Sequence, residues 1–375
     1  MNVLICPDKF KHCMNADEVS MAIALAVRSS YNQAKVIKIP LADGGEGSLN
    51  LVEKHLKGQR ISSNVNGPTG EPIKAEWLWF KDKKLAFVEM AKASGLELLE
   101  PDRLNIKSTS TMGTGQLIAS AISYGAKEVW LGFGGSATND GGAGMLSALG
   151  VRFYDEIGIE FRPDSASLKR VYNIDISSFN RVVKGVLFKS IVDVKSPLLG
   201  AEGATYKYAL QKGASKDELD ALEEGMRHWC SLLSDIKGED IGSVVGLGAA
   251  GGTASSCYAL MNSEIASGID VLLDMSGVYG EIKTSELIIT GEGSLDEQSI
   301  NDKLVSGVYR ECVKHNKKIV IICGKIDQEE KVRSFFKDAE IIVLGSNNEQ
   351  IRDIAYVHSL ILNKLIAYFN QSKSS

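Results

Sequence analysis

The sequence predicts an α/β protein of two domains, and three features of the 375-residue chain favour this class. Near its start, apolar strand patterns at 3–6 and 36–41 flank helical spacing over 16–28, which describes a β-α-β unit with parallel strands. The end of the chain returns to the same alternation of strands and helices. Between these ends, residues 61–89 hold three strand patterns separated by turn residues, which is typical of an antiparallel arrangement. We therefore expect a parallel-sheet domain formed by both chain ends and a mixed α/β domain inserted between them.

The individual elements follow from hydrophobic spacing and turn residues. In the terminal segments we expect helices at 48–56, 304–315 and 354–369 and strands at 287–290, 318–323 and 341–344. In the middle segment we expect helices at 114–124, 142–149 and 216–233 and strands at 129–131, 151–154 and 186–192. The change of pattern along the chain places the terminal domain at 1–63 plus 284–375 and the inserted domain at 64–283.

The composition of the chain argues against a membrane-spanning protein and against a nucleic-acid-binding protein. Apolar residues make up 44% of the chain and charged residues 24%, as in ordinary globular proteins. No stretch reaches the roughly 18 apolar residues of a membrane span, and the net charge of −5 without a basic tract argues against nucleic-acid binding. The six cysteines form no C-x-x-C pair, and the N-terminus lacks the apolar core of a signal peptide. We therefore expect a cytoplasmic protein with reduced thiols that binds neither membrane nor nucleic acid.

The most informative stretch is GFGGSATNDGGAG at 132–144, which follows an apolar strand and precedes a helix. Glycines such as Gly134 and Gly135 let the backbone approach a ligand closely, and a turn before a helix offers amide N–H groups to an anion. Asp140 in the same turn would repel a bare phosphate by roughly 4 kcal/mol at about 4 Å. Its carboxylate is better explained if it meets a divalent cation or accepts a substrate hydroxyl. A tight turn with nothing bound is the alternative.

Charged side chains follow several of the expected strands, at the edge where open α/β sheets bind ligands. These residues are Asp8, Lys11, Asp43, Glu46, Asp140, Asp193, Glu292, Asp296 and Lys303. Carboxylates can hold Mg²⁺, lysines and amides can hold phosphate oxygens, and an aspartate can accept the proton of an attacking hydroxyl. The pattern therefore favours a kinase that acts on a small molecule.

Two other functions are compatible with parts of the sequence. Residues 132–137 and 246–251 fit the G-x-G-x-x-G/A pattern of dinucleotide sites, which would suit an NAD(P)-dependent hydroxy-acid dehydrogenase. The polar run from Thr138, however, stands where the helix of such a site should already have begun. The motifs of P-loop proteins and protein kinases do not occur, so a kinase of this type belongs to a smaller family. A metabolite-binding protein without turnover is the second alternative.

The chain resembles the bacterial type I family of glycerate kinases from end to end and in the same order. The motifs are PDKFK at 7–11, LADGGEGS at 41–48, MAKASGLELL at 90–99, MGTGQLI at 112–118, GGSATNDGGAGMLSALG at 134–150, QKGA at 211–214, GAAGG at 248–252 and ITGEG at 289–293. This resemblance implies ATP-dependent phosphorylation of D-glycerate with Mg²⁺, usually at the 2-hydroxyl. It also implies a flavodoxin-like domain from both chain ends with a second α/β domain inserted, and we expect the active site in the cleft between them.

The resemblance further implies which residues form the site. For catalysis we expect Asp193, Lys11, Asp43 and Asp140, and for Mg²⁺ we expect Asp193 and Glu292. For substrate and phosphate binding we expect Asp8, Gly45, Glu46, Ser48, Gly134, Gly135, Ser136, Asn139, Lys212, Gly251, Glu292, Asp296 and Lys303. The chain departs from the family pattern at Lys9, Cys13, Ser294 and Asp302, where the family usually has serine, a small hydroxyl residue, arginine and glycine. Lys9, Ser294 and Asp302 are the residues that would favour the non-catalytic alternative.

Overall fold

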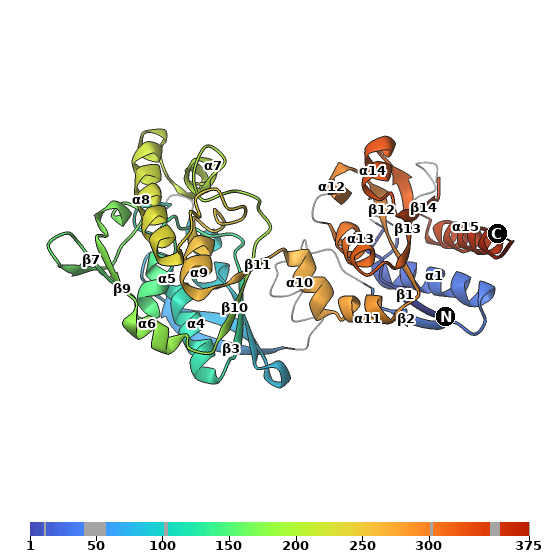
Figure 1. Ribbon diagram of the computed structural model, residues 1–375, viewed down its shortest axis with the longest axis horizontal. Coiled ribbons are helices and arrows are strands. Elements are labelled where there is room, and N and C mark those ends of the chain that lie inside the picture. The colour runs from blue at the N-terminus through green and yellow to red at the C-terminus, as the bar shows by residue number, and fades with distance from the viewer. Residues whose placement is uncertain (11–12, 41–57, 101–103, 301–302, 346–352, 375) are drawn as a thin grey trace. The chain divides into compact units, whose positions relative to one another are not determined.

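The computed structural model describes residues 1–375 except 11–12, 41–57, 101–103, 301–302, 346–352 and 375 (Figure 1). The chain forms two compact units. The terminal unit comprises Met1–Gly47 and Ile269–Ser375, and the inserted unit comprises Ser48–Gly268. Both contain strands and helices, so the predicted two-domain α/β class is confirmed.

The terminal unit is built on a five-stranded sheet in which every strand pair is parallel. Its strands are β1 (Asn2–Ile5), β2 (Lys35–Lys38), β12 (Leu287–Leu295), β13 (Lys318–Ile326) and β14 (Ala339–Val343). The spatial order β2-β1-β12-β13-β14 corresponds to 2-1-3-4-5 in chain order, which is the flavodoxin-like arrangement. Because β1 pairs with β12, with Val3 opposite Leu287, both chain ends contribute to one sheet.

Helices accompany this sheet, and the first shows how the sequence sets their limits. They are α1 (Ala16–Ser30), α10 (Gly268–Met275), α11 (Val278–Thr284), α12 (Glu297–Ile300), α13 (Leu304–Lys314), α14 (Glu329–Phe335) and α15 (Ile354–Ser374). Helix α1 begins at a capping box, since the Asn15 side chain accepts the Glu18 amide at 2.9 Å and the Glu18 carboxylate accepts the Asn15 amide at 2.8 Å. Its apolar face, with Val19 and Ile23, joins the core that Ile361 of α15 also enters.

The inserted unit contains a six-stranded mixed sheet of order β11-β10-β6-β5-β4-β3. Its strands are β3 (Gln59–Asn66), β4 (Pro72–Phe80), β5 (Leu85–Glu89), β6 (Glu128–Gly132), β10 (Leu187–Ile191) and β11 (Glu264–Ala266). The strands β5, β6, β10 and β11 are parallel, whereas β3, β4 and β5 form the expected antiparallel run. A separate three-stranded antiparallel sheet contains β7 (Arg152–Tyr154), β8 (Glu160–Phe161) and β9 (Asn173–Asp175).

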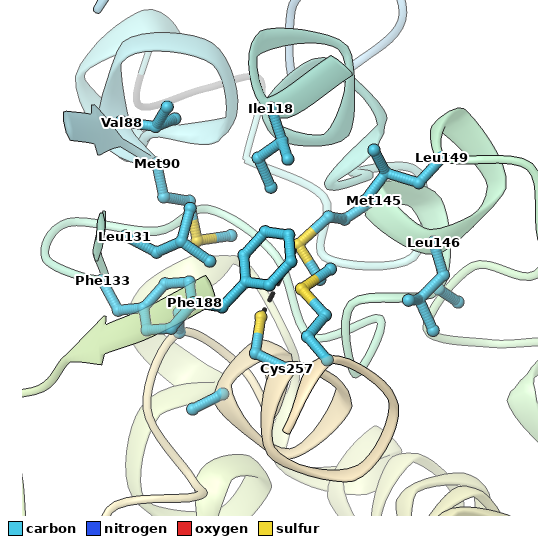
Figure 2. Close-up of a cluster of buried hydrophobic side chains, with 14 of the residues drawn as sticks. Val88, Met90, Ile118, Leu131, Phe133, Met145, Leu146, Leu149, Phe188 and Cys257 are labelled. Atoms are coloured by element: carbon cyan, nitrogen blue, oxygen red, sulfur yellow. Dashed lines mark hydrogen bonds between the residues drawn. The ribbon is translucent and has the colours of Figure 1, made fainter. Parts of the chain in front are cut away.

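Helices of the inserted unit enclose a sulfur-rich apolar core (Figure 2). They are α3 (Ala91–Ser94), α4 (Met112–Tyr124), α5 (Ala143–Ala148), α6 (Ser177–Val182), α7 (Ala204–Tyr208), α8 (Leu219–Lys237) and α9 (Thr253–Met261). Phe188 of β10 projects toward Met145 of α5 and Cys257 of α9, whose sulfur atoms lie 3.9 Å apart. This packing fixes the sheet against the helices, and so it fixes the positions of the loops that leave the strand ends.

Three boundaries differ from the sequence-based expectation, and one is the return to the terminal unit, which comes at Ile269 rather than at residue 284. The inserted unit begins earlier than residue 64, because β3 pairs along its length with β4 and so belongs to that unit. Strand β12 continues past Thr290 through Gly291 and Gly293 to Leu295, although this glycine-rich run suggests a loop. A side-chain carbon at Gly291 would lie 2.2 Å from the Ile322 carbonyl oxygen, so glycine here permits close strand pairing. The helix expected at 48–56 lies outside the described residues.

Candidate active site

Four parallel strands of the inserted unit end at the same edge of their sheet. Gly132 of β6 lies opposite both Glu89 of β5 and Ile191 of β10, and Ile191 lies opposite Ala266 of β11. The loops that follow these residues are therefore neighbours, at the edge where open α/β sheets bind ligands. One of these loops is the glycine-rich turn after β6, and another is the loop after β10, which contains Asp193. The structure therefore brings the predicted site residues of both loops to one edge of the sheet.

The glycine-rich turn exposes its first residues. Gly134 and Gly135 are exposed, and Gly135 has a φ of 65°, a conformation that favours glycine. The turn is fixed by two backbone hydrogen bonds, from the Leu96 amide to the Gly135 carbonyl at 2.8 Å and from the Ala137 amide to the Ser94 carbonyl at 2.9 Å. The amides of Gly134, Gly135 and Ser136 have no hydrogen-bond partner among the described residues. This arrangement suits the predicted role in anion binding.

Asp140 has a different environment from the one expected of a catalytic residue. Its side chain is fully buried, and its carboxylate accepts four hydrogen bonds at 2.8–3.2 Å from the amide and hydroxyl of Thr111 and from the amides of Gly142 and Gly144. Burial raises the pKa of Asp140, while these hydrogen bonds oppose that change. A carboxylate already bound by four donors has little capacity for a metal or a substrate proton, so the geometry favours a structural role and revises our expectation.

Lys212 also lies inside the unit rather than at its surface. It is 3% exposed, and its ammonium donates hydrogen bonds of 2.8 Å to the Ser136 hydroxyl and the Thr138 carbonyl. Burial lowers the pKa of Lys212 to about 7, and the charge of Asp140 opposes this shift. Direct contact with phosphate, which we expected from the sequence, does not fit this buried position. The lysine instead stabilises the glycine-rich turn from the interior of the unit.

The second glycine-rich turn packs directly against the first. Gly251 has a φ of 63°, and a side-chain carbon there would lie 2.0 Å from the Thr138 carbonyl oxygen. The Gly251 carbonyl accepts the Gly141 amide at 3.0 Å. Beside this contact, Asn139 donates to the Thr205 hydroxyl at 3.4 Å, while its side-chain oxygen is buried without a partner among the described residues. Gly251 and Asn139 therefore stabilise the conformation of the first glycine-rich turn.

Asp193 has the exposure that a catalytic group requires. It stands two residues after the end of β10 and is exposed. One carboxylate oxygen accepts the Gly268 amide at 3.1 Å. The other has no hydrogen-bond partner in the described part of the chain. One oxygen thus holds the side chain in place and leaves the second to act on a substrate.

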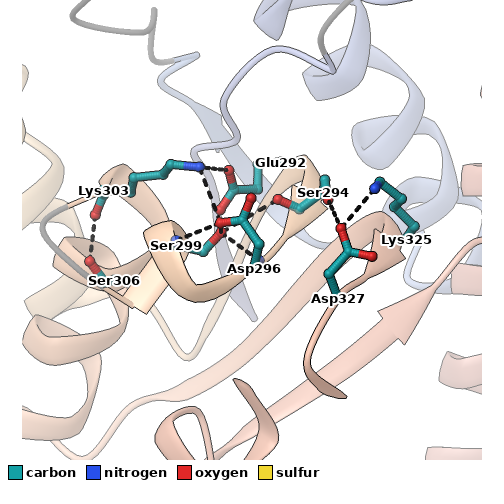
Figure 3. A network of polar contacts seen from close by, with 8 residues as sticks. All are labelled: Glu292, Ser294, Asp296, Ser299, Lys303, Ser306, Lys325 and Asp327. Atoms are coloured by element: carbon teal, nitrogen blue, oxygen red, sulfur yellow. Dashed lines mark hydrogen bonds and ion pairs between the residues drawn. The ribbon is translucent and has the colours of Figure 1, made fainter. Parts of the chain in front are cut away.

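The terminal unit carries a second group of predicted residues on and after β12 (Figure 3). Lys303 lies 3.4 Å from a Glu292 carboxylate oxygen and 3.6 Å from Asp296. The other Glu292 oxygen is buried without a partner among the described residues. Burial raises the pKa of Glu292, and Ser299 and Lys303 oppose this shift. Lys303 is therefore the counter-ion of both acids here, and Glu292 retains one oxygen that could bind a cation.

Asp8 lies next to this group, because its amide donates to the Gly291 carbonyl at 2.8 Å. Lys9, a departure from the family pattern, is exposed, and its amide donates to the Asp8 carboxylate at 2.6 Å. Ser294, another departure, lies 3.5 Å from Asp327 (Figure 3), and Cys13 is half-buried. Outside the described residues lie Lys11, Asp43, Gly45, Glu46, Ser48 and Asp302. The cleft between the domains stays a prediction.

Sequence reasoning missed two residues of the site. Thr111 holds Asp140 through both its amide and its hydroxyl, and the same hydroxyl accepts the Met145 amide at 2.8 Å. Glu89 ends β5 beside Gly132, at the same sheet edge as the turn. The only signal for Glu89 was an acidic residue at the end of the apolar run Leu85–Val88. Thr111 gave no signal, because its partner Asp140 is distant in the sequence.

The structural context argues against the hypothesis of a dinucleotide site. After the match at 132–137, helix α5 begins only at Ala143 and has six residues, whereas a dinucleotide site opens a helix directly from its glycine turn. The second match, at 246–251, follows turns rather than a strand. Neither pattern therefore has the strand-turn-helix geometry that binds the pyrophosphate of a dinucleotide.

Comparisons with known proteins identify relatives of this chain. A model described as the glycerate kinase family matches residues 3–356. A glycerate kinase from Bacillus cereus is 38% identical over 326 residues, which cover 87% of this chain and 86% of the relative. A glycerate 2-kinase from Escherichia coli is 37% identical over 347 residues, which cover 92% and 91%. A crystal structure assigned as glycerate kinase 2 from Salmonella typhimurium has a TM-score of 0.75 and 30% identity, with 100% of both chains covered.

Among the described helices, none combines the length and the apolar content that crossing a bilayer requires. The matched family model spans most of the sequence, and the relatives cover it at more than 30% identity. The chain therefore belongs to the glycerate kinase family.

Proposed function

We propose that this protein transfers the terminal phosphoryl group of ATP to the 2-hydroxyl of D-glycerate, which gives 2-phosphoglycerate and ADP. Membership of the family supports the reaction, and the name of the Escherichia coli relative, glycerate 2-kinase, supports the choice of hydroxyl. The structural observation that carries the proposal is the exposed carboxylate of Asp193, at the same sheet edge as the amides of Gly134 and Gly135. A base and an anion-binding turn at one edge are what a phosphoryl acceptor needs.

In this proposal Asp193 is the general base. It accepts the proton of the glycerate 2-hydroxyl while the hydroxyl oxygen attacks the terminal phosphorus of ATP, and the bond from that phosphorus to the ADP oxygen breaks. The Gly268 amide holds one carboxylate oxygen, so the second can face the substrate without reorientation. The amides of the turn hold negatively charged oxygens by donating to them.

The described residues also fit the Mg²⁺ that such a reaction uses. Mg²⁺ prefers oxygen ligands and takes one or two carboxylates together with water and substrate phosphates. Glu292 of the terminal unit offers a buried carboxylate oxygen without a partner among the described residues. Asp193 of the inserted unit was the other expected ligand, but its unpartnered oxygen is assigned here to the substrate proton. The described residues contain no group of three or more metal-ligating side chains, which such a site does not require. When bound, the ion would neutralise charge on the phosphate oxygens.

We further propose that the protein acts in the cytoplasm. All six cysteines are free thiols, and all but Cys13 are buried. Burial raises the pKa of buried thiols such as Cys257 and Cys323, each to about 12, so these thiols are unreactive. A protein with this many unpaired thiols suits a reducing compartment.

A coupled assay of ADP release tests the proposal. The purified protein should release ADP from MgATP when D-glycerate is added, and removal of Mg²⁺ with a chelator should stop the reaction. ADP release without dependence on D-glycerate would refute the substrate assignment. No release at all, together with measurable binding of D-glycerate, would support the non-catalytic alternative. Reduction of NAD(P)⁺ by hydroxy acids in place of ADP release would support the dehydrogenase alternative.

A further inference from the structure

Lys212 is the only buried lysine among the described residues. It ends the short helical turn η5 (Leu210–Lys212), and Gly213 follows with a φ of 93°. A side-chain carbon at Gly213 would lie 2.4 Å from the Leu104 carbonyl oxygen, so this turn packs closely against the segment at Leu104. The lysine side chain therefore enters the interior of the unit from a fixed backbone.

Both hydrogen bonds of the Lys212 ammonium end on the glycine-rich turn after β6. The acceptors are the Ser136 hydroxyl oxygen and the Thr138 carbonyl oxygen, each at 2.8 Å. An ammonium can only donate hydrogen bonds. The Ser136 oxygen therefore accepts from Lys212, and the hydrogen of the Ser136 hydroxyl is left for another acceptor. Among the described residues Ser136 has no second partner.

Unpartnered hydrogen-bond donors lie together at the start of the turn, although Ser136 itself is only 6% exposed. Gly134 and Gly135 are exposed, and their amides and the Ser136 amide have no partner in the described part of the chain. Together with the Ser136 hydroxyl they form a set of hydrogen-bond donors at the carboxyl end of β6. A set with this polarity suits an oxyanion, which is either a carboxylate or a phosphate group.

We infer that Lys212 is a positioning residue for this anion site: it holds turn 134–138 from inside and orients the Ser136 hydroxyl as a donor toward a substrate oxyanion, without touching the substrate. The inference rests on the proposed function only for the identity of the two ligands. Shape alone would not explain a lysine here, because burial of an ammonium costs several kcal/mol and a methionine would fill the same space. The charge accounts for the orientation of Ser136.

Calorimetric titration of the full chain with D-glycerate, and separately with ADP, tests this inference. The variants are Ser136→Ala, Lys212→Met and the double variant, at a pH below the pKa of about 7 that burial gives Lys212. Each single variant should weaken binding of the same ligand at least about tenfold, and the double variant should be weaker than either by no more than about twofold. The affected ligand shows whether the oxyanion is the carboxylate of glycerate or the phosphate of the nucleotide.

Lys237→Met is the matched control. The Lys237 ammonium also donates to a side-chain oxygen in the same unit, that of Asn262 at 2.8 Å, but away from the turn. Its replacement should leave both affinities unchanged, and a loss as large as that of Lys212→Met would contradict the inference.

Three other results would overturn the inference. Lys212→Met could lower the melting temperature yet bind both ligands with wild-type affinity, which would make the lysine a structural residue only. The losses could multiply in the double variant, which would mean that Lys212 contacts the ligand independently of Ser136. Should Lys212→Met fail to fold, unchanged affinities in Ser136→Ala would decide against the inference. Turnover is not measured, so a failure of the proposed reaction leaves this test intact.

Discussion

Asp193 is the residue on which the proposed chemistry depends most, and Asp193→Asn tests its role. Asparagine retains the oxygen that accepts the Gly268 amide but cannot accept a proton from the substrate. We expect turnover at saturating Mg²⁺ to fall at least about a hundredfold, which is roughly 3 kcal/mol of transition-state stabilisation. The melting temperature should fall by no more than about 3 °C.

The control for this prediction is Asp235→Asn, because Asp235 is also exposed in the inserted unit but lies on α8. It should keep wild-type turnover. If Asp193→Asn retains more than about a third of the wild-type rate, Asp193 serves the loop and not the reaction.

Lys212 should make the stability of the protein depend on pH. Burial lowers its pKa to about 7 in the folded state from the ordinary lysine value of 10.5, so between these pH values the unfolded chain binds more protons. The contribution of Lys212 to the free energy of unfolding should therefore rise with pH through this window, by at most about 1.4 kcal/mol per pH unit. Below about pH 7 both states are protonated and the contribution should be constant.

Urea unfolding of wild-type protein and Lys212→Met near pH 7 and near pH 9 measures this effect. The stability of the wild type relative to the variant should increase at the higher pH. An equal difference at both pH values would show that the pKa of Lys212 is not lowered by burial.

Sequence reasoning identified the residues of the central turn but not what each of them does. Asp140 was expected to be catalytic because the sequence shows a carboxylate in a glycine-rich turn. Its donor Thr111 is 29 residues away in the chain, so the hydrogen bonds that occupy its carboxylate are visible only in the fold. The same holds for Lys212, which is 76 residues from Ser136. The position of Asp193 after a strand was easier to predict, because it follows from the apolar run before it.

At the scale of elements, the two glycine-rich turns support each other, and Gly251→Ala tests this contact. Alanine at Gly251 would combine an unfavourable positive φ with a clash against the Thr138 carbonyl, 2.0 Å from the new carbon. We expect the variant to lose about 1–3 kcal/mol more stability than backbone strain alone would cost. It should also weaken catalysis, because the displaced Thr138 carries one of the two acceptors of Lys212.

Gly238→Ala is the matched control, since Gly238 has a φ of 82° but nothing within 4 Å of the added carbon. It ends α8 and should show the cost of the backbone conformation alone, about 1 kcal/mol. Urea unfolding of both variants compares the two costs. Equal losses of unfolding free energy in the two variants would mean that the turns rearrange at little cost and that their contact does not fix the site.

Element boundaries show where sequence patterns are least informative. Gly291 and Gly293 were read as a loop, although they lie in β12 because glycine allows close pairing with β13. The small sheet of β7, β8 and β9 was expected only in part, since none of its three strands has more than three residues. Long periodic elements such as α8, with Leu222, Met226 and Trp229 on its buried face, were located correctly.

At the scale of the whole molecule, the fold class was predictable because both chain ends carry the same βα alternation. Parallel strands such as β1 and β12 need each other as partners, so two separate β-α segments favour one shared sheet. The two large clusters of buried hydrophobic side chains among the described residues draw on different parts of the chain, in agreement with two units. The exact boundary at β3 depends on strand pairing, which local patterns do not show.

Proton-coupled phosphorus NMR of the product formed from ATP and D-glycerate shows whether phosphoryl transfer occurs and which hydroxyl receives the group. We expect a new phosphomonoester signal that appears with ADP and is split into a doublet by the single proton on carbon 2 of 2-phosphoglycerate. A triplet would place the phosphate on carbon 3, beside two protons, and would contradict the proposed hydroxyl. The absence of any new phosphomonoester, with ATP, Mg²⁺ and D-glycerate all present, would contradict the claim that this protein is a glycerate kinase.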